Sequence, residues 1–447
     1  MDLGARVVEA ARKAGADVAE VLAVDSADLS AKVRMGEPEL IEEAGSHGLG
    51  LRVIKEGRSA ITYTSDPTED GLAALVADAL ELAALSEPDE LALPPDPSEL
   101  ATAFPELDLY DPAGGGVDAA QATEWALAAE QAARDVDPRI TNSEGATYGR
   151  TRSAVALVTS GGFSAGYRGS YQSLHVAPIA DDADGKKRNG FYWDARRHLA
   201  AMATPESVGQ EAARRTLAKL GAKKVPTAEV PVVFDPDAGR ALLSLFFSCV
   251  SGGAIYKRAS YLIGKEGERV ASDLVTFVDD PLLARAPGSR PFDGEGLASR
   301  RNVVVEQGIL RTWLMDTYSA RKLDKQSTAS AARGVGGRPS VAPTNFHLLA
   351  GSASAEEVVA GVKSGLYVTS MMGFGFNAVT GDFSRGAEGF WIEDGKLTFP
   401  VSEVTISLNF NELWASVDAV ASDLDPKTRY ACPTFRVSKM TLAGTSA

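Results

Sequence analysis

Apolar residues in the first half of the chain recur at the spacings of helices and strands. Leu3, Val7 and Val8 lie on one face of a predicted N-terminal helix, and Gly15 supplies its stop. Alternating apolar and polar residues then predict half-buried strands. Before residue 222 the sequence predicts helices at about 3–14, 68–85 (capped by Asp66), 117–136 and 205–221, strands at 29–35, 49–53 and 59–64, and several glycine-cornered strands within 140–200.

The second half of the chain predicts mostly strands. Lys223–Pro226 marks a natural domain boundary, and a strand at 229–234 precedes a helix capped by Asp235. Two turn signals between apolar runs, Gln307-Gly308 and Asp394-Gly395, predict hairpins. Further helices are expected near 317–323 and 355–365. The pattern therefore predicts an α+β fold, with a mixed α/β N-terminal domain at 1–222 and a β-rich C-terminal domain at 223–447.

Charge and composition exclude several classes of protein. The 447 residues carry 45 Lys+Arg and 60 Asp+Glu, a net charge of −15, which argues against binding to nucleic acid or to anionic lipid. Cys249 and Cys432 are too few for a disulfide framework. The longest strongly apolar run, Ala241–Val250, is about half of a membrane span. With no secretory signal at the N-terminus, we expect a soluble cytoplasmic protein.

Local motifs offer little catalytic chemistry. Gly162–Gly166 matches Gly-x-Ser-x-Gly, but both flanks predict strands, so a hairpin corner is favoured over a nucleophile at Ser164. Gly373–Phe376 lacks the third glycine of a dinucleotide-binding loop. For Asp279-Asp280 an exposed turn is favoured over an acidic metal pair. The histidines lie too far apart in sequence for a local metal site: His47, His175, His198 and His347.

Longer motifs in the C-terminal half resemble the TldD/PmbA family, most closely its PmbA (TldE) branch. The longest match is Gly381–Gly395 (GDFSRGAEGFWIEDG), followed by 400–406 (PVSEVTI). Further matches are Ser251–Ala254 (SGGA), Pro291–Gly296 (PFDGEG) and Tyr318–Leu323 (YSARKL). The resemblance implies a TldD/PmbA-like fold and a heterodimeric zinc metalloprotease that acts on unfolded or small peptides.

The resemblance also implies where a metal would be held. In the TldD subunit a His-Glu-x-x-x-His helix and a later cysteine bind zinc, and the glutamate takes a proton from the metal-bound water. The matching helix positions here are Leu243, Ser244 and Ser248, and the cysteine matches Cys432. A leucine has no lone pair, neutral hydroxyls are poor zinc ligands, and one thiolate cannot hold zinc alone. We therefore expect no catalytic residue and no metal in this chain, with zinc in a TldD-like partner.

A glycine-rich segment of the longest motif is the candidate wall of a peptide channel or chamber. Its glycines allow close approach of an extended peptide backbone. Arg385 is a candidate for holding a substrate carboxylate, and an ion pair with Asp382 or Glu388 is the favoured alternative. The candidate wall residues are Gly381, Asp382, Ser384, Arg385 and Gly386.

The leading functional hypothesis is a metal-free, non-catalytic subunit of a TldD/TldE-type peptidase, paired with a zinc-binding TldD-like chain and handling a peptide substrate. One alternative is a homodimer that binds or scaffolds without peptidase activity. Others are a stand-alone hydrolase that uses Ser164 or unrecognised carboxylates, and a repurposed pair that tailors a peptide-like metabolite. The substrate, its cleavage preference and the choice between homodimer and heterodimer are not encoded in any motif.

Overall fold

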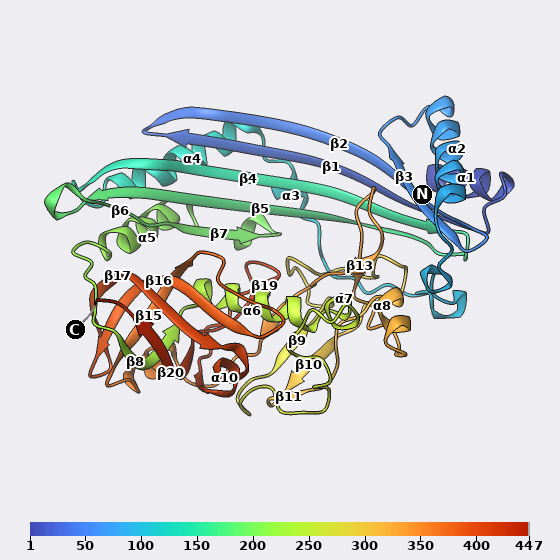
Figure 1. The fold of residues 1–447 in the computed structure, drawn as a ribbon. Coiled ribbons are helices and arrows are strands. Elements are labelled where there is room, and N and C mark those ends of the chain that lie inside the picture. The colour runs from blue at the N-terminus through green and yellow to red at the C-terminus, as the bar shows by residue number, and fades with distance from the viewer. Residues whose placement is uncertain (446–447) are drawn as a thin grey trace.

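The computed structural model describes residues 1–445, and a long antiparallel sheet spans the length of the molecule above a C-terminal domain (Figure 1). Its strand order is β3-β2-β1-β4-β5-β6, with β7 also paired to β5. Four of these strands have 17 to 20 residues. The strands are β1 (Val18–Arg34), β2 (Glu37–Lys55), β3 (Arg58–Thr64), β4 (Ile140–Thr159), β5 (Ser164–Asp181), β6 (Lys187–Asn189) and β7 (Tyr192–Arg196).

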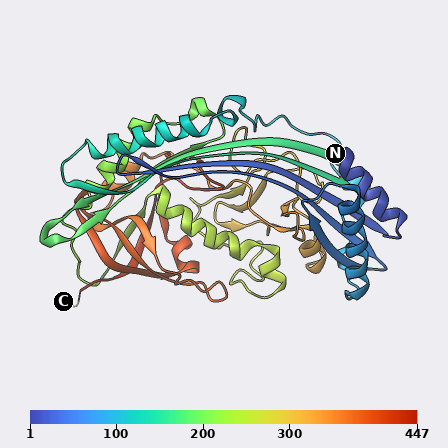
Figure 2. The same cartoon turned by 90° about the horizontal axis from the view of Figure 1, so that it is seen from above.

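One face of this sheet is covered by helices at both ends, as the view from above shows (Figure 2). α1 (Asp2–Lys13) and α2 (Glu69–Leu85) bury Val21 of β1 at one end. At the other end α4 (Ala119–Arg134) and α5 (Pro205–Leu217) bury Leu29 and Val33. The opposite face of β1 turns Leu22 toward Phe292 of the C-terminal domain. Because successive side chains of β1 point to opposite faces of the sheet, this strand packs against helices on one face and against the C-terminal domain on the other.

The C-terminal half contains two larger sheets. In one, β17-β16-β15-β8-β20 closes through a β17–β20 pairing, with β18 added to β20. The other has the order β11-β10-β9-β14-β19, and β12 and β13 form a separate pair. The strands are β8 (Ala228–Phe234), β9 (Phe277–Asp279), β10 (Asn302–Glu306), β11 (Ile309–Leu310), β12 (Ala331–Ala332), β13 (Ser340–Val341), β14 (Phe346–Leu348), β15 (Ser364–Met372), β16 (Asp382–Glu393), β17 (Lys396–Asn409), β18 (Val417–Val420), β19 (Tyr430–Ala431) and β20 (Phe435–Ala443).

The core of the C-terminal half is built around α6 (Pro236–Val250), an apolar helix capped by Asp235, whose carboxylate accepts the Ala238 N–H. Phe246 of this helix lies 4.6 Å from Phe277, measured between ring centroids, and both contact Trp414. The connector is the segment 86–118 between α2 and α4, and it contains α3 (Pro112–Gly115) and 3₁₀ turns at Glu90–Ala92 and Pro97–Glu99. Short helices complete the C-terminal domain: α7 (Gly252–Tyr256), α8 (Thr317–Lys322), α9 (Ala355–Ala360) and α10 (Phe410–Ala415). Two further 3₁₀ turns, Ala183–Gly185 and Leu199–Ala201, lie in the N-terminal half.

The structure confirms the predicted α+β class and corrects two element boundaries. Thr68, not Asp66, caps α2, because the Thr68 hydroxyl accepts the Gly71 N–H while Asp66 accepts the Thr68 N–H. The helix expected at 355–365 ends at Ala360, because Ser364 already begins β15, which pairs with β16 and β8. No helix within residues 1–445 is long and apolar enough to cross a membrane.

Candidate functional site

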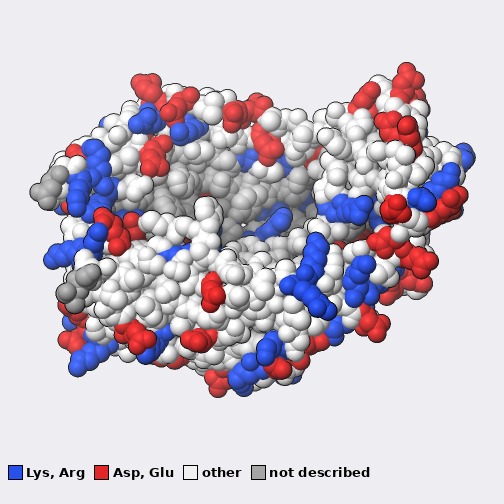
Figure 3. Space-filling model, in the orientation of Figure 1, with Lys and Arg blue, Asp and Glu red and all other residues white. Residues whose placement is uncertain are grey.

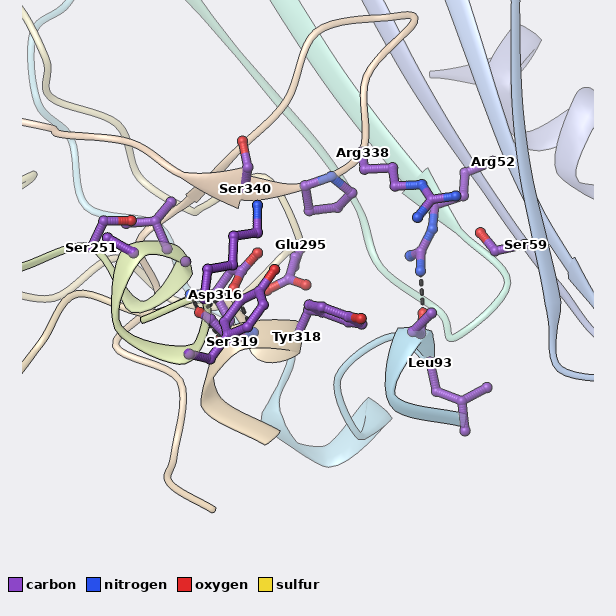
Figure 4. Close-up of a pocket in the computed structure, with 17 residues that line it drawn as sticks. Arg52, Ser59, Leu93, Ser251, Glu295, Asp316, Tyr318, Ser319, Arg338 and Ser340 are labelled. Atoms are coloured by element: carbon purple, nitrogen blue, oxygen red, sulfur yellow. Dashed lines mark hydrogen bonds between the residues drawn. The ribbon is translucent and has the colours of Figure 1, made fainter. Parts of the chain in front are cut away.

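A cavity of about 600 Å³ lies where the long sheet meets the C-terminal domain. The face seen in Figure 3 is hollowed between these two parts, and Lys and Arg side chains lie in and beside the hollow. A volume of this size is typical of small-ligand sites. Residues from seven segments line it (Figure 4): Arg52 of β2, Ser59 of β3, Ala92 and Leu93 of the connector, 251–257 around α7, Glu295, 316–319 of α8, and 338–341, which include β13.

A buried charge cluster joins the two domains at one side of this cavity. Glu20 of β1 accepts hydrogen bonds from Arg52 Nη1 at 2.9 Å and from Arg333 Nη1 at 2.7 Å. The Glu20 and Arg333 side chains are 2% and 4% exposed. Burial acts to raise the pKa of Glu20, but the two guanidinium charges outweigh it and lower that pKa. One carboxylate thus serves two cations, which leaves the cluster with one uncompensated positive charge.

Several guanidinium N–H groups in this cluster lack partners. Arg52 donates to the Ala92 carbonyl, yet its buried Nε has no hydrogen-bond partner among the described residues. The same holds for Nε and Nη2 of Arg333. Buried donors of this kind are normally satisfied, so an unsatisfied one next to a cavity suggests a missing acceptor. Of the two arginines, Arg52 lines the cavity.

The acidic side chains of the cavity are engaged by their own surroundings. Glu295 Oε2 accepts the backbone N–H and the hydroxyl of Thr317 at 2.9 and 2.7 Å. Asp316 caps α8 through the Ser319 N–H at 2.8 Å. Burial, and next the negative charge of Asp293, raise the pKa of Glu295 to about 8. Glu295 is therefore mostly protonated at neutral pH, and a protonated carboxyl can donate a hydrogen bond.

Two further cations line the cavity without acidic partners. Lys257 and Arg338 are both exposed, and neither forms an ion pair within residues 1–445. The Lys257 ammonium lies 5.6 Å from the centre of the Tyr256 ring, which is its only charge-related contact in the described chain. Together with Arg52 they make the cavity locally cationic in a chain whose net charge is −15.

Close packing holds the walls of the cavity together. The segment between β12 and β13 crosses to the long sheet, where a Cβ on Gly50 would lie 1.8 Å from the Val335 carbonyl oxygen. Arg321 of α8 donates to the carbonyls of Leu91, Leu93 and Pro94 in the connector. Tyr318 donates to Asp89 of the same connector at 2.9 Å. Glycine at the sheet and arginine on α8 therefore fix both sides of the cavity.

The positions predicted to match the metal ligands do not converge on a metal-binding geometry. Leu243 is 0% exposed and belongs to the apolar core. The Ser244 and Ser248 hydroxyls donate to the carbonyls of Ala241 and Leu245, three residues earlier in the same helix. No group of three His, Cys, Asp or Glu side chains that could hold a metal occurs in residues 1–445. The donor set present on α6 does not fit a zinc ion.

Cys432 is separated from the serines along α6. It is 1% exposed, and its Sγ lies 3.6 Å from the Pro236 carbonyl oxygen at the start of the helix. Burial raises the pKa of the Cys432 thiol well above its usual value. Because zinc binds the thiolate, a site that favours the neutral thiol is poorly suited to the metal.

The candidate wall residues lie at the start of β16 and just before it. Gly381 is buried with φ +83°, Asp382 and Ser384 are exposed, and Arg385 and Gly386 are half-buried. None of them lines the cavity described above. The structure places them beside the loop 373–379, where Phe374 is 99% exposed.

The prediction that Arg385 forms an ion pair with Asp382 or Glu388 is wrong. Asp382 instead accepts hydrogen bonds from Thr380 and Asn409, and Glu388 pairs with Lys219 at 3.3 Å. Arg385 therefore has no carboxylate partner in the described chain, and burial lowers its pKa. The register explains the error: Arg385 shares a strand face with Phe383, and its guanidinium lies 6.0 Å from that ring.

The remaining candidate residues are dispersed. Ser164 begins β5 opposite Val158 in a hairpin with β4, so no helix follows it. The exposed turn expected at Asp279-Asp280 is wrong: these residues are 1% and 9% exposed, because their carboxylates accept the Thr344 and Leu282 N–H groups. The histidines lie apart from one another: His47 contacts Asp25, His175 stacks on Phe191, His198 contacts Asp108, and His347 is buried in β14.

Sequence reasoning did not place the candidate site at this cavity, although three of its motifs meet there. Ser251–Ala254, Pro291–Gly296 and Tyr318–Leu323 supply α7, Glu295 and α8. The signal available was that these motifs contain glycines and charged residues whose role is not explained by any neighbouring residue in the sequence. Arg52 and Arg338 carried no such signal, because they come from ordinary strand and loop sequence.

Comparisons with known proteins place the whole chain in one family. Models described as PmbA/TldA metallopeptidase domain 1, central domain and C-terminal domain match residues 19–83, 113–220 and 227–444. The protein called metalloprotease PmbA from Escherichia coli O157:H7 is 34% identical over 96% of this chain and 92% of its own length.

Solved structures share the fold. A crystal structure from Bacteroides thetaiotaomicron, described as a putative modulator of DNA gyrase, has a TM-score of 0.92 and 29% identity, and the match covers 99% of this chain and 98% of that one. TldE from Thermococcus kodakarensis has the same fold, with a TM-score of 0.89, 22% identity, and coverage of 99% and 100%. The chain described here therefore belongs to the PmbA/TldD metallopeptidase family.

Proposed function

We propose that this chain is the metal-free, non-catalytic subunit of a two-chain peptidase whose other subunit, a TldD-like chain, carries zinc. The observation that carries the proposal is the side-chain chemistry of α6. Leu243 lies in the core where a zinc ligand would stand, and the Ser244 and Ser248 hydroxyls are hydrogen-bonded within the helix. The general base that would activate a metal-bound water is also missing from this helix.

The proposal assigns the chain two tasks: closing a chamber around the partner's active site and contacting the peptide. An exposed apolar patch supports a docked partner. Phe374 is 99% exposed, and the nearby Met372 and Val379 are 52% and 55% exposed. Large apolar side chains gathered on a surface mark interaction sites. In this proposal the segment from Gly381 to Gly386, which follows the patch, belongs to the chamber wall.

Zinc content and peptide hydrolysis test the proposal together. We expect the purified chain to bind less than 0.1 equivalents of zinc, on the order of a trace contaminant, and to cleave no unfolded peptide. Adding the TldD-like chain from the same organism should give a stoichiometric complex that holds zinc and cleaves. Stoichiometric zinc in this chain alone, or cleavage by it alone, would overturn the assignment.

A homodimeric binding or scaffolding protein is the competing hypothesis. Co-purification decides between the two, because only the two-chain peptidase predicts recovery of a chain that carries His-Glu-x-x-x-His. The stand-alone hydrolase is tested by Ser164→Ala. Unchanged cleavage by that variant would eliminate the serine mechanism.

A further inference from the structure

The interdomain cavity combines basic groups that its own side chains do not satisfy with acidic groups that are already engaged. It is bordered by Arg52, whose residue is 8% exposed and whose Nε lacks a partner in the described chain. It holds two cations, Lys257 and Arg338, that have no acidic partner in the part of the chain that the structure describes. Its carboxyl groups, on Glu295 and Asp316, are already hydrogen-bonded to α8.

These features favour an anionic ligand. The Glu20–Arg52–Arg333 cluster retains one positive charge after its internal pairing. Burial strengthens the attraction of such a charge for an anion, because water screens it poorly there. A chain with a net charge of −15 repels anions at long range, so any anion that binds must be held by local contacts.

The shape of the cavity favours a peptide over a small inorganic anion. A volume of about 600 Å³ is much larger than a phosphate needs. Two tyrosine rings, those of Tyr256 and Tyr318, line it with their centroids 5.9 Å apart. β13 also lines it and is paired with β12 along one edge only, so its other edge keeps peptide groups that an extended chain could meet.

We propose that this cavity binds the C-terminal carboxylate of a short extended peptide, with Arg52, Lys257 and Arg338 as the carboxylate-recognising residues. The choice of a peptide rests on the proposed function as well as on the shape of the cavity, whereas the anion site rests on the charges alone. Arginine donors suit this role because a guanidinium can bind a carboxylate through two parallel hydrogen bonds.

Protonated Glu295 supports carboxylate binding at neutral pH. The neutral carboxyl does not repel an incoming carboxylate and can donate to it. Ionisation above about pH 8 adds a negative charge beside Asp316 and Asp293, and this charge offsets part of the attraction from the three basic side chains of the cavity and from Arg290, which acts on Asp293. Peptide affinity should therefore fall as the pH rises from 7 to 9, and Glu295→Gln should remove most of that fall, because glutamine stays neutral.

The test compares a fluorescently labelled alanine pentapeptide that ends in a free carboxylate with the same peptide ending in an amide. Fluorescence anisotropy with the isolated full chain at low salt gives both dissociation constants. We expect the acid to bind at least about tenfold more tightly, a difference of about 1.4 kcal/mol. Arg338→Glu and Lys257→Glu should bring the two forms to similar affinity. Lys396→Glu is the matched control, since this exposed lysine does not line the cavity, and it should keep the preference.

Three outcomes would overturn the proposal: equal affinity of acid and amide, an unchanged preference in both charge-reversal variants, or displacement of the peptide by micromolar inorganic phosphate. The last would assign the site to a free phosphate ion. Because the assay needs neither zinc nor a partner, its failure is separate from a failure of the two-chain peptidase. Zinc binding by this chain would leave the acid–amide difference standing.

Discussion

Helix α6 is followed directly by residues that line the interdomain cavity, but the polar groups of the helix and of the cavity are satisfied in opposite ways. On α6 the serine hydroxyls are bonded to carbonyls of the same helix, and Leu243 is packed in the core. At the cavity, whose lining includes Ser251 just after α6, Arg52 keeps an unpartnered buried donor and Lys257 has no acidic partner within residues 1–445. Buried polar groups that lack a hydrogen-bond partner indicate a ligand or partner, whereas groups that are hydrogen-bonded within their own helix do not.

The largest expected effect tests whether the buried cluster holds the two domains together. Glu20→Ala leaves two guanidinium groups buried without their carboxylate, so we expect a loss of about 3–5 kcal/mol in the free energy of unfolding. Urea unfolding followed by circular dichroism measures this loss. Asp25→Ala is the control on the same strand, because its ion pair with His47 is exposed and should contribute at most about 1 kcal/mol. Equal losses in both variants would show that the cluster is not a domain clamp.

A second prediction contrasts two of the positions on α6. Leu243→Ala removes a fully buried side chain and should lower the free energy of unfolding by about 2–5 kcal/mol. Ser248→Ala changes an exposed hydroxyl and should stay within about 0.5 kcal/mol of the parent. Urea titrations of both variants, with activity assays of the two-chain complex, provide the check. A large loss of activity with Ser248→Ala at unchanged stability would place a functional group on α6.

The third prediction concerns pH and Glu295. Its pKa in the folded chain is about 8, above the usual value of 4.5, so the folded state binds the extra proton between these limits. The contribution of Glu295 to the free energy of unfolding is therefore fully present below about pH 4.5. It is lost as the pH rises to 8, by at most about 1.4 kcal/mol per pH unit. Buried Asp235 and Asp279 have raised pKa values and act in the same direction.

The contribution of Glu295 is isolated by comparing urea unfolding of the parent and Glu295→Gln at several pH values from 5 to 9. The parent should lose more stability than the variant across this range. Parallel curves would mean that Glu295 is already ionised in the folded chain, and the cavity would then be less favourable for a carboxylate.

The smallest expected effect is at the apolar patch. Phe374→Ser should leave the free energy of unfolding nearly unchanged, because the side chain is 99% exposed, and should weaken assembly with the TldD-like chain by about 1–2 kcal/mol. Isothermal titration calorimetry measures the affinity. Leu85→Ser, at a residue 78% exposed on α2, is the control and should not alter assembly. Loss of affinity in the control alone would move the interface to the helical end of the sheet.

The sequence predicted most of the elements correctly where local signals were strong. The cap at Asp235, the hairpin at Asp394-Gly395 and the helix at 317–323 are close to their observed places, because caps and turns depend on nearby residues. The sequence pattern underestimated the lengths of β1 and β2. It predicted strands at about 29–35 and 49–53, whereas the observed strands extend over 17 and 19 residues. Long strands are stabilised by pairing with distant strands, and that pairing leaves only a weak local pattern.

By itself the sequence determined the family, the α+β class and the absence of metal-binding side chain types at Leu243, Ser244 and Ser248, since these follow from residue identity and short-range order. Only the tertiary structure decided that Glu20, Arg52 and Arg333 share one buried site, and that no acid among the described residues pairs with Arg385. Electrostatic attraction and desolvation depend on distance in space. No local sequence signal shows that two residues 313 positions apart in the chain form a contact.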